Sequence, residues 1–429
     1  MSLLLDTGCS LSQPNPDIPE QKIAFNYTKL SQDDLNFLSR FDIIVTSHFP
    51  DDETVKRLKS KKIKLIHYDW LPGIYHCTHH DDWEEMVYQN RFLWALDPQD
   101  SDPNPMGEKY GCMDLFYDMG NDDLIDVRVD HIVSIIKTNH YDGVFFDWGS
   151  GWDAFKENRY DFLIEAFKKR HPDINYNDKV NEFIKRLKDK GLFIMMNRGF
   201  RSDHSQLDRY VDVDVIESMF TTTECNNVSY EIFIASTGLT KACDTWFNTV
   251  SRSIDLATKL PNQARSANRN IQFLFLNYAF PYYKETRGRT KIDDIEYILY
   301  EESTDRQALF YSLACSYMGE SSGFTAGPNV GLQHVKDDVY FYQLGRAESD
   351  IQKIKDDVYM RYFSRGIVVV SGEETTLEIV LPKGINKIFD LYNKKIENIT
   401  HNKVSLKLVS QVYPSGSKHP IGRIYLYEH

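Results

Sequence analysis

Short runs of apolar residues recur along most of the chain, and helical segments separate most of them. The runs are centred near Ile23, Ile43, Leu65, Val144, Ile194, Val215, Phe273 and Phe324. Strands that are buried on both faces appear as continuous apolar runs, because helices cover both sides of the sheet. Eight such runs alternating with helices predict a (β/α)8 TIM barrel over residues 20–360 rather than an open doubly wound sheet. No G-x-G-x-x-G motif follows the first run to favour a dinucleotide-binding fold.

The pattern changes from about Tyr362 onward. The segments "RGIVVVSG", "TTLEIVLP", "KIFDLYN", "VSLKLVS" and "GRIYLYEH" are β-rich runs joined by polar turns, with no helical period between them. Residues 361–429 are therefore predicted to form a small antiparallel β domain, a β-sandwich that follows the barrel.

Composition narrows the choice of partners. The 429 residues include 63 acidic and 50 basic side chains, which give a formal net charge of −13. Binding to the phosphate backbone of nucleic acid requires clustered Lys and Arg that displace counterions. The acidic balance therefore argues against a nucleic-acid partner and favours neutral or cationic ones.

The chain has no run of roughly 18 apolar residues, so we expect no membrane-spanning helix. Its opening, "MSLLLDTGCS", has neither the basic region nor the apolar length of a secretory signal. These features do not decide the cellular compartment, and secretion remains an alternative if a leader has been removed from the chain. Oligomeric state and disulfide state also stay open at this point.

In a (β/α)8 barrel the active site lies at the carboxyl ends of the strands, so the residues that end each run are candidates for function. These residues are Tyr27, His48, Tyr68, Asp69, Asp147, Trp148, Asn197, Glu217, Asn277 and Tyr278. None of the runs ends in Lys, which disfavours Schiff-base chemistry. A polar, aromatic and acid-rich rim of this kind favours a carbohydrate substrate.

Two of these strand ends are carboxylates, Asp147 and Glu217. Glycoside hydrolysis needs two carboxyl groups with different pKa values, one to protonate the leaving oxygen and one to attack the anomeric carbon or activate water. We therefore predict Asp147 and Glu217 as the catalytic pair, with Trp148 and Trp152 as rings on which a sugar stacks. The alternative is that both acids form structural ion pairs with bases such as Arg198, and that Trp152 anchors its loop.

A cluster of metal-ligand residue types occurs in "HCTHHDD", which contains His76, His79 and His80. A metal site usually combines ligand pairs at defined spacing, whereas this segment reads as a loop with no second pair. We therefore predict no metal ligand and no cofactor, and keep a metal-dependent lyase or hydrolase as an alternative.

Several motifs together resemble the barrel glycosidases related to glycoside hydrolase family 114, which include the endo-α-1,4-polygalactosaminidases. The motifs are "RFLWALDPQD", "DLFYDMGNDDLIDVRVDHIVSIIKTNHYDGVFFDWGS", "LFIMMNRG" and "VDVDVIESMF". The resemblance extends from about Ile23 to Phe220. It implies that Asp147 is the nucleophile, that Asn197 ends the following strand, and that Glu217 is the general acid/base.

Three features of the chain are not matched by the polygalactosaminidases: a long insertion from Thr221 to about Lys259, the "HCTHHDD" loop and the C-terminal β domain. The identity of the sugar therefore does not carry over from the resemblance. The sequence predicts a glycoside hydrolase that cleaves a polysaccharide or oligosaccharide. The alternatives are a carbohydrate-binding barrel without catalysis and the metal-dependent enzyme. Whether the reaction retains or inverts configuration depends on the separation of the two carboxylates.

Overall fold

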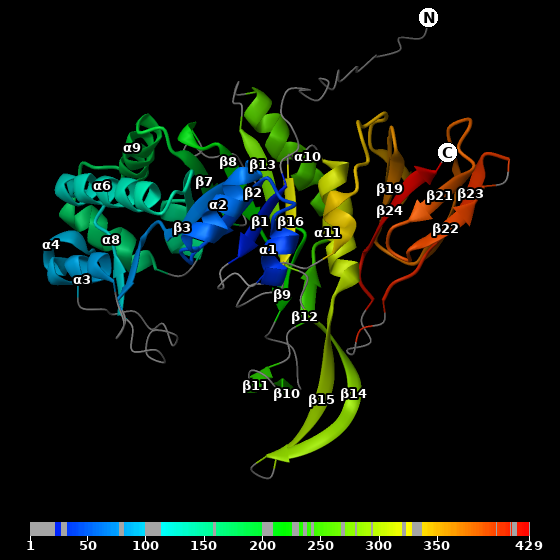
Figure 1. Ribbon diagram of the computed structural model, residues 1–429, viewed down its shortest axis with the longest axis horizontal. Coiled ribbons are helices and arrows are strands. Elements are labelled where there is room, and N and C mark those ends of the chain that lie inside the picture. The colour runs from blue at the N-terminus through cyan, green and yellow to red at the C-terminus, as the bar shows by residue number, and fades with distance from the viewer. Residues whose placement is uncertain are drawn as a thin grey trace, which may run out of the picture.

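A computed structural model gives the structure of the chain (Figure 1). It describes residues 22–26, 32–76, 81–98, 113–157, 160–199, 209–224, 231–234, 238–241, 244–266, 271–278, 281–292, 295–319, 323–327, 337–399, 401–411, 413 and 418–428. Within these ranges, no helix is both long and apolar enough to cross a membrane.

An eight-stranded parallel sheet forms the centre of the molecule, in the order β1-β2-β3-β6-β7-β8-β13-β16. Its strands are β1 (Ile23–Asn26), β2 (Ile43–Thr46), β3 (Lys64–Trp70), β6 (Gly143–Asp147), β7 (Phe193–Asn197), β8 (Val213–Glu217), β13 (Gln272–Tyr278) and β16 (Gly323–Gly327). The first seven coincide with apolar runs that predict strands, which confirms those predictions.

The eighth predicted strand, near Phe324, corresponds to β16, a short strand that is paired with β13. The edge strands β1 and β16 lie side by side. No ladder joins them within the part of the chain that the structure describes. The structure therefore shows a nearly closed parallel barrel rather than a fully closed one.

Helices cover the outside of this barrel. They are α1 (Gln32–Leu38), α2 (Asp52–Ser60), α3 (Asp82–Gln89), α4 (Arg91–Trp94), α6 (Asp122–Thr138), α7 (Trp152–Glu157), α8 (Asp161–Arg170), α9 (Tyr176–Asp189), α10 (Val250–Ser266) and α11 (Arg306–Met318). Side chains of Asp51, Asn121 and Asn175 accept hydrogen bonds from the first turns of α2, α6 and α9. These caps fix where each helix begins after its strand.

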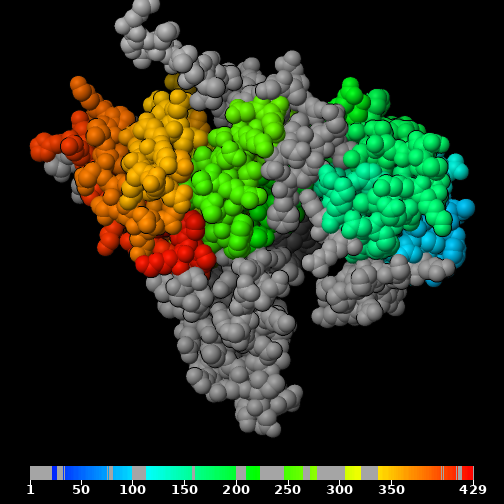
Figure 2. Space-filling model, turned by 180° about the vertical axis from the view of Figure 1, so that it is seen from behind, coloured from blue at the N-terminus to red at the C-terminus, as the bar shows by residue number. Residues whose placement is uncertain are grey.

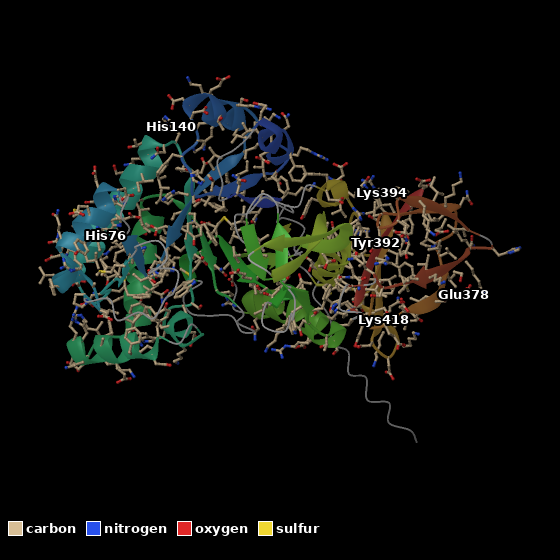
Figure 3. All side chains as sticks on the ribbon, turned by 90° about the horizontal axis from the view of Figure 1, so that it is seen from below. His76, His140, Glu378, Tyr392, Lys394 and Lys418 are labelled. Carbon is tan, nitrogen blue, oxygen red and sulfur yellow. The ribbon has the colours of Figure 1, made fainter. Side chains whose placement is uncertain are left out.

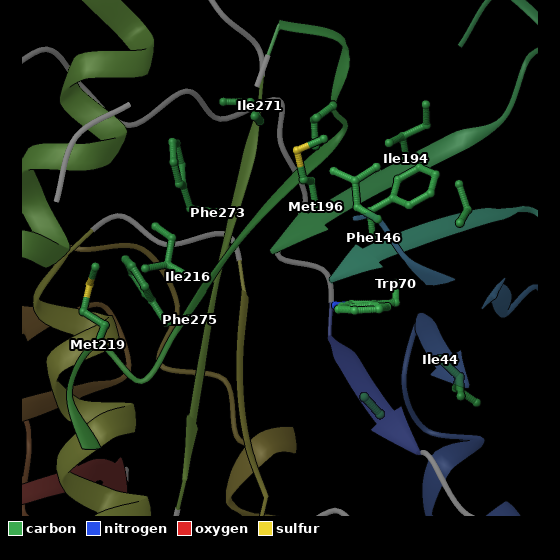
Figure 4. Packing of buried hydrophobic residues seen from close by; sticks show 14 of the residues in the cluster. Ile44, Trp70, Phe146, Ile194, Met196, Ile216, Met219, Ile271, Phe273 and Phe275 are labelled. Atoms are coloured by element: carbon green, nitrogen blue, oxygen red, sulfur yellow. The ribbon is translucent and has the colours of Figure 1, made fainter. Parts of the chain in front are cut away.

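Two apolar layers hold the barrel together. Alternate strand residues such as Phe145, Met195 and Val215 fill the interior of the barrel. Their neighbours, including Phe146 and Met196, face outward into the layer between strands and helices (Figure 4). Both faces of β1, β2, β6, β7 and β8 are thus buried, which is the reason that the sequence shows continuous apolar runs there.

Additional strands lie outside this barrel. β4 (Gly73–His76) pairs with β5 (Met113–Phe116) after β3, and β9 (Thr221–Glu224) pairs with β12 (Asp244–Phe247) after β8. A four-stranded sheet joins β10 (Glu231–Ile234) and β11 (Gly238–Lys241) to the hairpin of β14 (Pro281–Ile292) and β15 (Ile295–Thr304). This hairpin projects far from the barrel in Figure 1. Because β14 follows the carboxyl end of β13, the projection belongs to the same end of the barrel as the candidate site.

The C-terminal part forms two antiparallel sheets, as the sequence predicts. A six-stranded sheet has the order β17-β18-β19-β24-β21-β22, and β20 pairs with β23. The bounds are β17 (Gln352–Lys355), β18 (Val358–Phe363), β19 (Gly366–Ser371), β20 (Thr375–Val380), β21 (Lys387–Asp390), β22 (Lys395–Asn398), β23 (Lys403–Leu408) and β24 (Ile421–Glu428). The expected boundary at residue 361 falls inside β18.

Helix α11 connects the barrel to this C-terminal domain. Nearly all of its residues are buried, and it packs on β13 and β16 as well as on β19 and β24. Gly422 of β24 is needed for this approach, since a Cβ there would lie 2.4 Å from the carbonyl oxygen of Phe310. In Figure 2 the C-terminal domain and α10 form one continuous surface.

Candidate active site

Three predicted site residues end adjacent strands of the barrel: Asp147 on β6, Asn197 on β7 and Glu217 on β8. Each lies two residues after a side chain of the barrel interior, namely Phe145, Met195 and Val215. Because side chains alternate along a strand, all three project toward the inside of the rim. The structure therefore brings the predicted carboxylates together.

One amide nitrogen links the two carboxylates. Nδ2 of Asn197 donates to Oδ1 of Asp147 at 2.8 Å and to Oε2 of Glu217 at 2.6 Å. The two acceptor oxygens can therefore be no farther apart than the sum of these two distances. Asn197 is itself 3% exposed, and its Oδ1 accepts from the backbone N–H of Gly199 at 2.9 Å. This second bond fixes which end of the amide faces the carboxylates.

Asp147 receives further hydrogen bonds on both oxygens. The hydroxyl of Tyr68 on β3 donates to Oδ2 at 2.8 Å, and the backbone N–H of Trp148 donates to Oδ1 at 2.9 Å. Donors from β3, from β7 and from the backbone of the next residue thus hold this carboxylate in one orientation. Tyr68, which the sequence predicts as a substrate contact, is thus a neighbour of Asp147 in the structure.

The chain turns sharply directly after each carboxylate. Trp148 has a φ of 55° and Ser218 has a φ of 56°, in the left-handed region that most residues avoid. Strained backbone of this kind is stable only when the surrounding structure enforces it. After Trp148, the N–H of Gly149 donates to the carbonyl oxygen of Asn197 at 2.6 Å, and a Cβ at Gly149 would collide with Met196. Glycine is therefore required for this close approach.

The two tryptophans after β6 have different surroundings. Trp148 is half-buried and meets the rings of Trp70 and Tyr160 at centroid distances of 5.5 and 5.9 Å. Trp152 begins α7 and stacks on Tyr176 at 4.4 Å, while its backbone N–H donates to Oδ1 of Asn177 at 3.0 Å. Trp148 is thus placed beside the carboxylate, and Trp152 anchors helices α7 and α9.

Two of the candidate polar residues face outward from the barrel. Asp69 pairs with the buried Arg128 of α6 at 3.2 Å. Asn277 is fully buried, and its Oδ1 accepts from the backbone N–H groups of Phe220 and Thr221 at 2.9 and 3.3 Å. Asn277 therefore supports the turn that follows Glu217, and the structure places neither residue with the carboxylate pair.

Arg198 also faces away from the pair. Its Nε lies 3.0 Å from Oδ2 of Asp214, and both side chains are 1% exposed. The sequence left open that Arg198 forms an ion pair with Asp147 or Glu217. In the structure Arg198 forms an ion pair with Asp214. His48 is exposed beyond β2, with its carbonyl oxygen bound by Tyr141. Tyr27 and the side chain of Tyr278 lie outside the described residues.

The predicted histidine loop is only partly described. His76 contacts Glu85 at 3.2 Å and stacks on Tyr88 at 4.1 Å, whereas His79 and His80 lie outside the described residues. Figure 3 shows His76 on the barrel, far from Tyr392 and Lys418 of the C-terminal domain. No group of three or more potential metal ligands occurs among the side chains that the structure describes.

Sequence reasoning missed Arg128. Its guanidinium donates to the carbonyl oxygens of Leu71 and Trp70 at 2.6 and 3.2 Å, and so fixes the end of β3 beside Tyr68. The signal was present, because Arg128 is a charged residue one helical turn from Leu124 and Ile132 on the apolar face of α6. A lone charge on a buried helical face indicates a specific partner.

No protein-family model matches the chain, and no curated protein matches its sequence. Several solved structures resemble it distantly. The glycoside hydrolase domain of PelA from Pseudomonas aeruginosa is 14% identical, with 74% of this chain and 98% of that one covered and a TM-score of 0.44. The maltogenic α-amylase AmyB from Thermotoga neapolitana is 9% identical, with 95% and 99% covered and a TM-score of 0.47. The chitinase ChiB from Flavobacterium johnsoniae is 11% identical, with 73% and 89% covered and a TM-score of 0.37. These likenesses are distant, and none of them assigns an activity to this chain.

Proposed function

We propose that the chain is a glycoside hydrolase of the (β/α)8 barrel type, with Asp147 as nucleophile and Glu217 as general acid/base. The observation that carries the proposal is the single amide nitrogen of Asn197 shared by both carboxylates. The sum of its two hydrogen bonds is an upper limit on the separation of the two bonded oxygens, and this limit favours the about 5–5.5 Å spacing of retaining pairs over the roughly 6.5 Å or more of inverting pairs. A retaining reaction through a covalent intermediate is therefore proposed.

In the first step, the proton of Glu217 passes to the glycosidic oxygen while the bond from that oxygen to the anomeric carbon breaks. An oxygen of Asp147 forms a bond to the same carbon and gives a glycosyl ester. In the second step, a water molecule gives its proton to Glu217 and its oxygen to the anomeric carbon, which releases Asp147. Tyr68 and Asn197 hold Asp147 in one orientation throughout, and Trp148 provides a ring against which the sugar packs.

The resemblance to glycoside hydrolase family 114 supports the same assignment of Asp147, Asn197 and Glu217. Membership of that family is part of the proposal, whereas the identity of the sugar does not carry over from the resemblance and is determined by the test below. The net charge of −13 agrees with a neutral or cationic sugar more than with an anionic one.

The test is hydrolysis of a panel of polymers of galactosamine, N-acetylglucosamine, glucose and galacturonate. We expect one of them to be cleaved with release of the same anomer as in the substrate, which proton NMR of the first products reports. Asp147→Asn and Glu217→Gln should each reduce kcat by about 10²–10⁴-fold. The exposed residues Asp189 and Glu165 provide matched controls, since Asp189→Asn and Glu165→Gln should leave kcat unchanged.

The alternative of a carbohydrate-binding barrel without catalysis makes the opposite prediction. The protein would be a lectin and not an enzyme if it binds a glycan without turnover and if Asp147→Asn and Glu217→Gln leave that binding unchanged. Release of the opposite anomer would instead keep the enzyme and reject the retaining mechanism.

A further inference from the structure

A cavity of about 260 Å³ lies where the barrel meets the C-terminal domain, and we name it the seam pocket. It is lined by Phe341, Tyr342, Gln343, Arg365, Leu426 and Tyr427. Phe341 ends a short 3-10 helix, η2 (Asp338–Phe341), Arg365 lies in the turn between β18 and β19, and Leu426 and Tyr427 belong to β24. Three segments that are distant in the sequence therefore build this pocket.

The seam pocket is separate from the carboxylate pair. The ring of Phe341 packs on Phe37 of α1 at a centroid distance of 5.7 Å, and the guanidinium of Arg40 lies 3.6 Å from the centroid of Phe341. The Nζ of Lys22, which precedes β1, lies 5.4 Å from the same centroid. The pocket is thus beside the amino end of β1, whereas Asp147 and Glu217 lie at the carboxyl ends of their strands.

The lining has the chemistry that recognises a sugar ring. Tyr342 is 39% exposed and offers a ring face to the C–H groups of a pyranose. Arg365 and Gln343 are exposed and carry planar groups with several donors, which suit pairs of sugar hydroxyls. This combination of an aromatic ring with planar hydrogen-bonding groups is what a mostly hydroxylated ligand requires.

The walls of the pocket are held in place by the backbone. The N–H of Arg365 donates to the carbonyl oxygen of Leu344, and the N–H of Tyr427 donates to that of Arg365, both at 2.9 Å. Gly345 has a φ of 77°, and a Cβ there would lie 2.2 Å from Oγ of Ser364. A preformed site loses little conformational entropy when a ligand binds.

We propose that the seam pocket binds one sugar unit of a glycan and so tethers the polymer to the enzyme away from the reacting bond. This inference rests on the proposed function, since it extends the same substrate class to a second site. Arg365 is the one charged residue in the described lining. Its charge favours a neutral sugar or a uronate over a protonated amino sugar.

The tether acts through effective concentration. A long polymer held at the seam pocket meets the carboxylate pair more often than a free polymer does, whereas an oligosaccharide too short to reach both sites gains nothing. Loss of the pocket should therefore raise KM for the polymer, while kcat and the KM for a short substrate stay constant.

The first experiment measures binding by isothermal titration in the Asp147→Asn background, which blocks turnover. The probes are tetrasaccharides of glucose, of galacturonate and of glucosamine. We expect Tyr342→Ala and Arg365→Ala each to remove one binding event, or to weaken it about tenfold, while Tyr342→Phe keeps it. Arg346→Ala is the matched control, because Arg346 is exposed on the neighbouring turn and does not line the pocket.

The outcomes separate the two proposals. If wild-type protein cleaves a glycan but titrations of Tyr342→Ala and Arg365→Ala match that of Arg346→Ala, the seam pocket proposal is wrong and the proposed function stands. If no glycan is cleaved but these two substitutions abolish binding of a probe, the pocket binds sugar and the proposed function fails. Absence of any binding to the three probes, or tightest binding of the glucosamine probe, overturns the pocket as proposed.

Discussion

Asn197 is the residue on which the geometry of the carboxylate pair depends. Both protons of its Nδ2 are engaged, one with Asp147 and one with Glu217. A hydrogen bond to a charged group contributes about 1.5–3 kcal/mol, so we expect Asn197→Ala to lower kcat by about 10- to 100-fold. Asn197→Asp should be worse, because a third carboxylate would repel the other two.

Initial rates on the glycan identified by the panel measure this effect. The exposed Asn36 supplies the control, since Asn36→Ala should keep the wild-type rate. A structural role alone would lower thermal stability and the fraction of active enzyme while leaving the pH profile of kcat in place. An unchanged pH profile in Asn197→Ala would therefore contradict a direct role beside the carboxylates.

Asn277 is expected to affect stability more than chemistry. Asn277→Ala would leave the backbone N–H groups of Phe220 and Thr221 buried without an acceptor. Each such group costs about 1–3 kcal/mol, so we expect a loss of about 2–4 kcal/mol in the free energy of unfolding. Urea denaturation measures this loss. A change below about 0.5 kcal/mol, the range of ordinary surface substitutions, would show that the turn after Glu217 does not need Asn277.

At the level of single elements, β6 and β7 approach too closely for any side chain at Gly143. A Cβ at this position would lie 1.8 Å from the carbonyl oxygen of Phe193. We expect Gly143→Ala to destabilise the protein by about 1–3 kcal/mol through overpacking. Gly191→Ala is the comparison: Gly191 has open space around it but a φ of 83°, so its cost of about 1 kcal/mol is conformational. Equal melting temperatures for wild type and Gly143→Ala would contradict the close approach.

The positions of the barrel strands could be predicted from the sequence, but which residues of each strand point into the barrel and which point outward could not. Continuous apolar runs located β1, β2, β3, β6, β7, β8 and β13 because both faces of these strands are buried. For the same reason the runs lack the alternation that distinguishes inward from outward residues. In the sequence Asp69 and Asn277 therefore look equivalent to Tyr68 and Glu217, although in the structure they lie on the outward face of their strands.

The strands β10, β11, β14 and β15 of the projecting sheet could not be predicted from apolar runs in the sequence. Residues 281–304 mix aromatic, basic and acidic residues, as in "YYKETRGRTK", and contain no long apolar run. Pairing between β10 and β15 joins segments that are more than 60 residues apart, as the partners Ile232 and Ile298 show. Such long-range pairing depends on tertiary contacts that periodicity along the chain does not report.

For the whole molecule, partly buried histidines should set the response to acid. Burial lowers the pKa of His67, His131 and His419, and for His67 it does so in spite of the nearby carboxylates of Asp69 and Asp81. The unfolded chain therefore takes up protons near pH 6.5 that the folded chain does not. Stability should be highest above this pH and should fall as the pH decreases from there toward the lowered pKa values of the folded state.

Melting temperatures between pH 8 and pH 5 test this dependence. His67→Phe should flatten it, because the His67 ring stacks on Phe49 at 5.6 Å and its buried Nδ1 has no partner among the described residues. The exposed His48 provides the control through His48→Gln, which should retain the wild-type slope. Equal slopes in wild type and His67→Phe would exclude His67 as a source of acid sensitivity.

The C-terminal domain is joined to the barrel by more than packing. Gln307 of α11 is fully buried and donates from Nε2 to the carbonyl oxygens of His419 and Pro420 at 2.8 and 3.0 Å. Arg361 of β18 donates in return to the carbonyl oxygens of Met318 and Gly319 at 2.9 and 3.0 Å, which satisfies the end of α11. Neither part contains all the partners that its buried polar groups need.

Helix α11 also has a consequence for the order of events during synthesis. Its nearly all-buried surface is covered on one side by β24, a strand in the middle of its sheet. A ribosome that has made the whole barrel has therefore not yet made residues 421–428, and α11 stays uncovered until they emerge. The nascent chain thus presents an apolar helix for the time needed to add roughly 100 further residues, several seconds at about 5–20 residues per second. During that interval the barrel strands β13 and β16 can cover one side of α11, while the side that later meets β24 stays exposed.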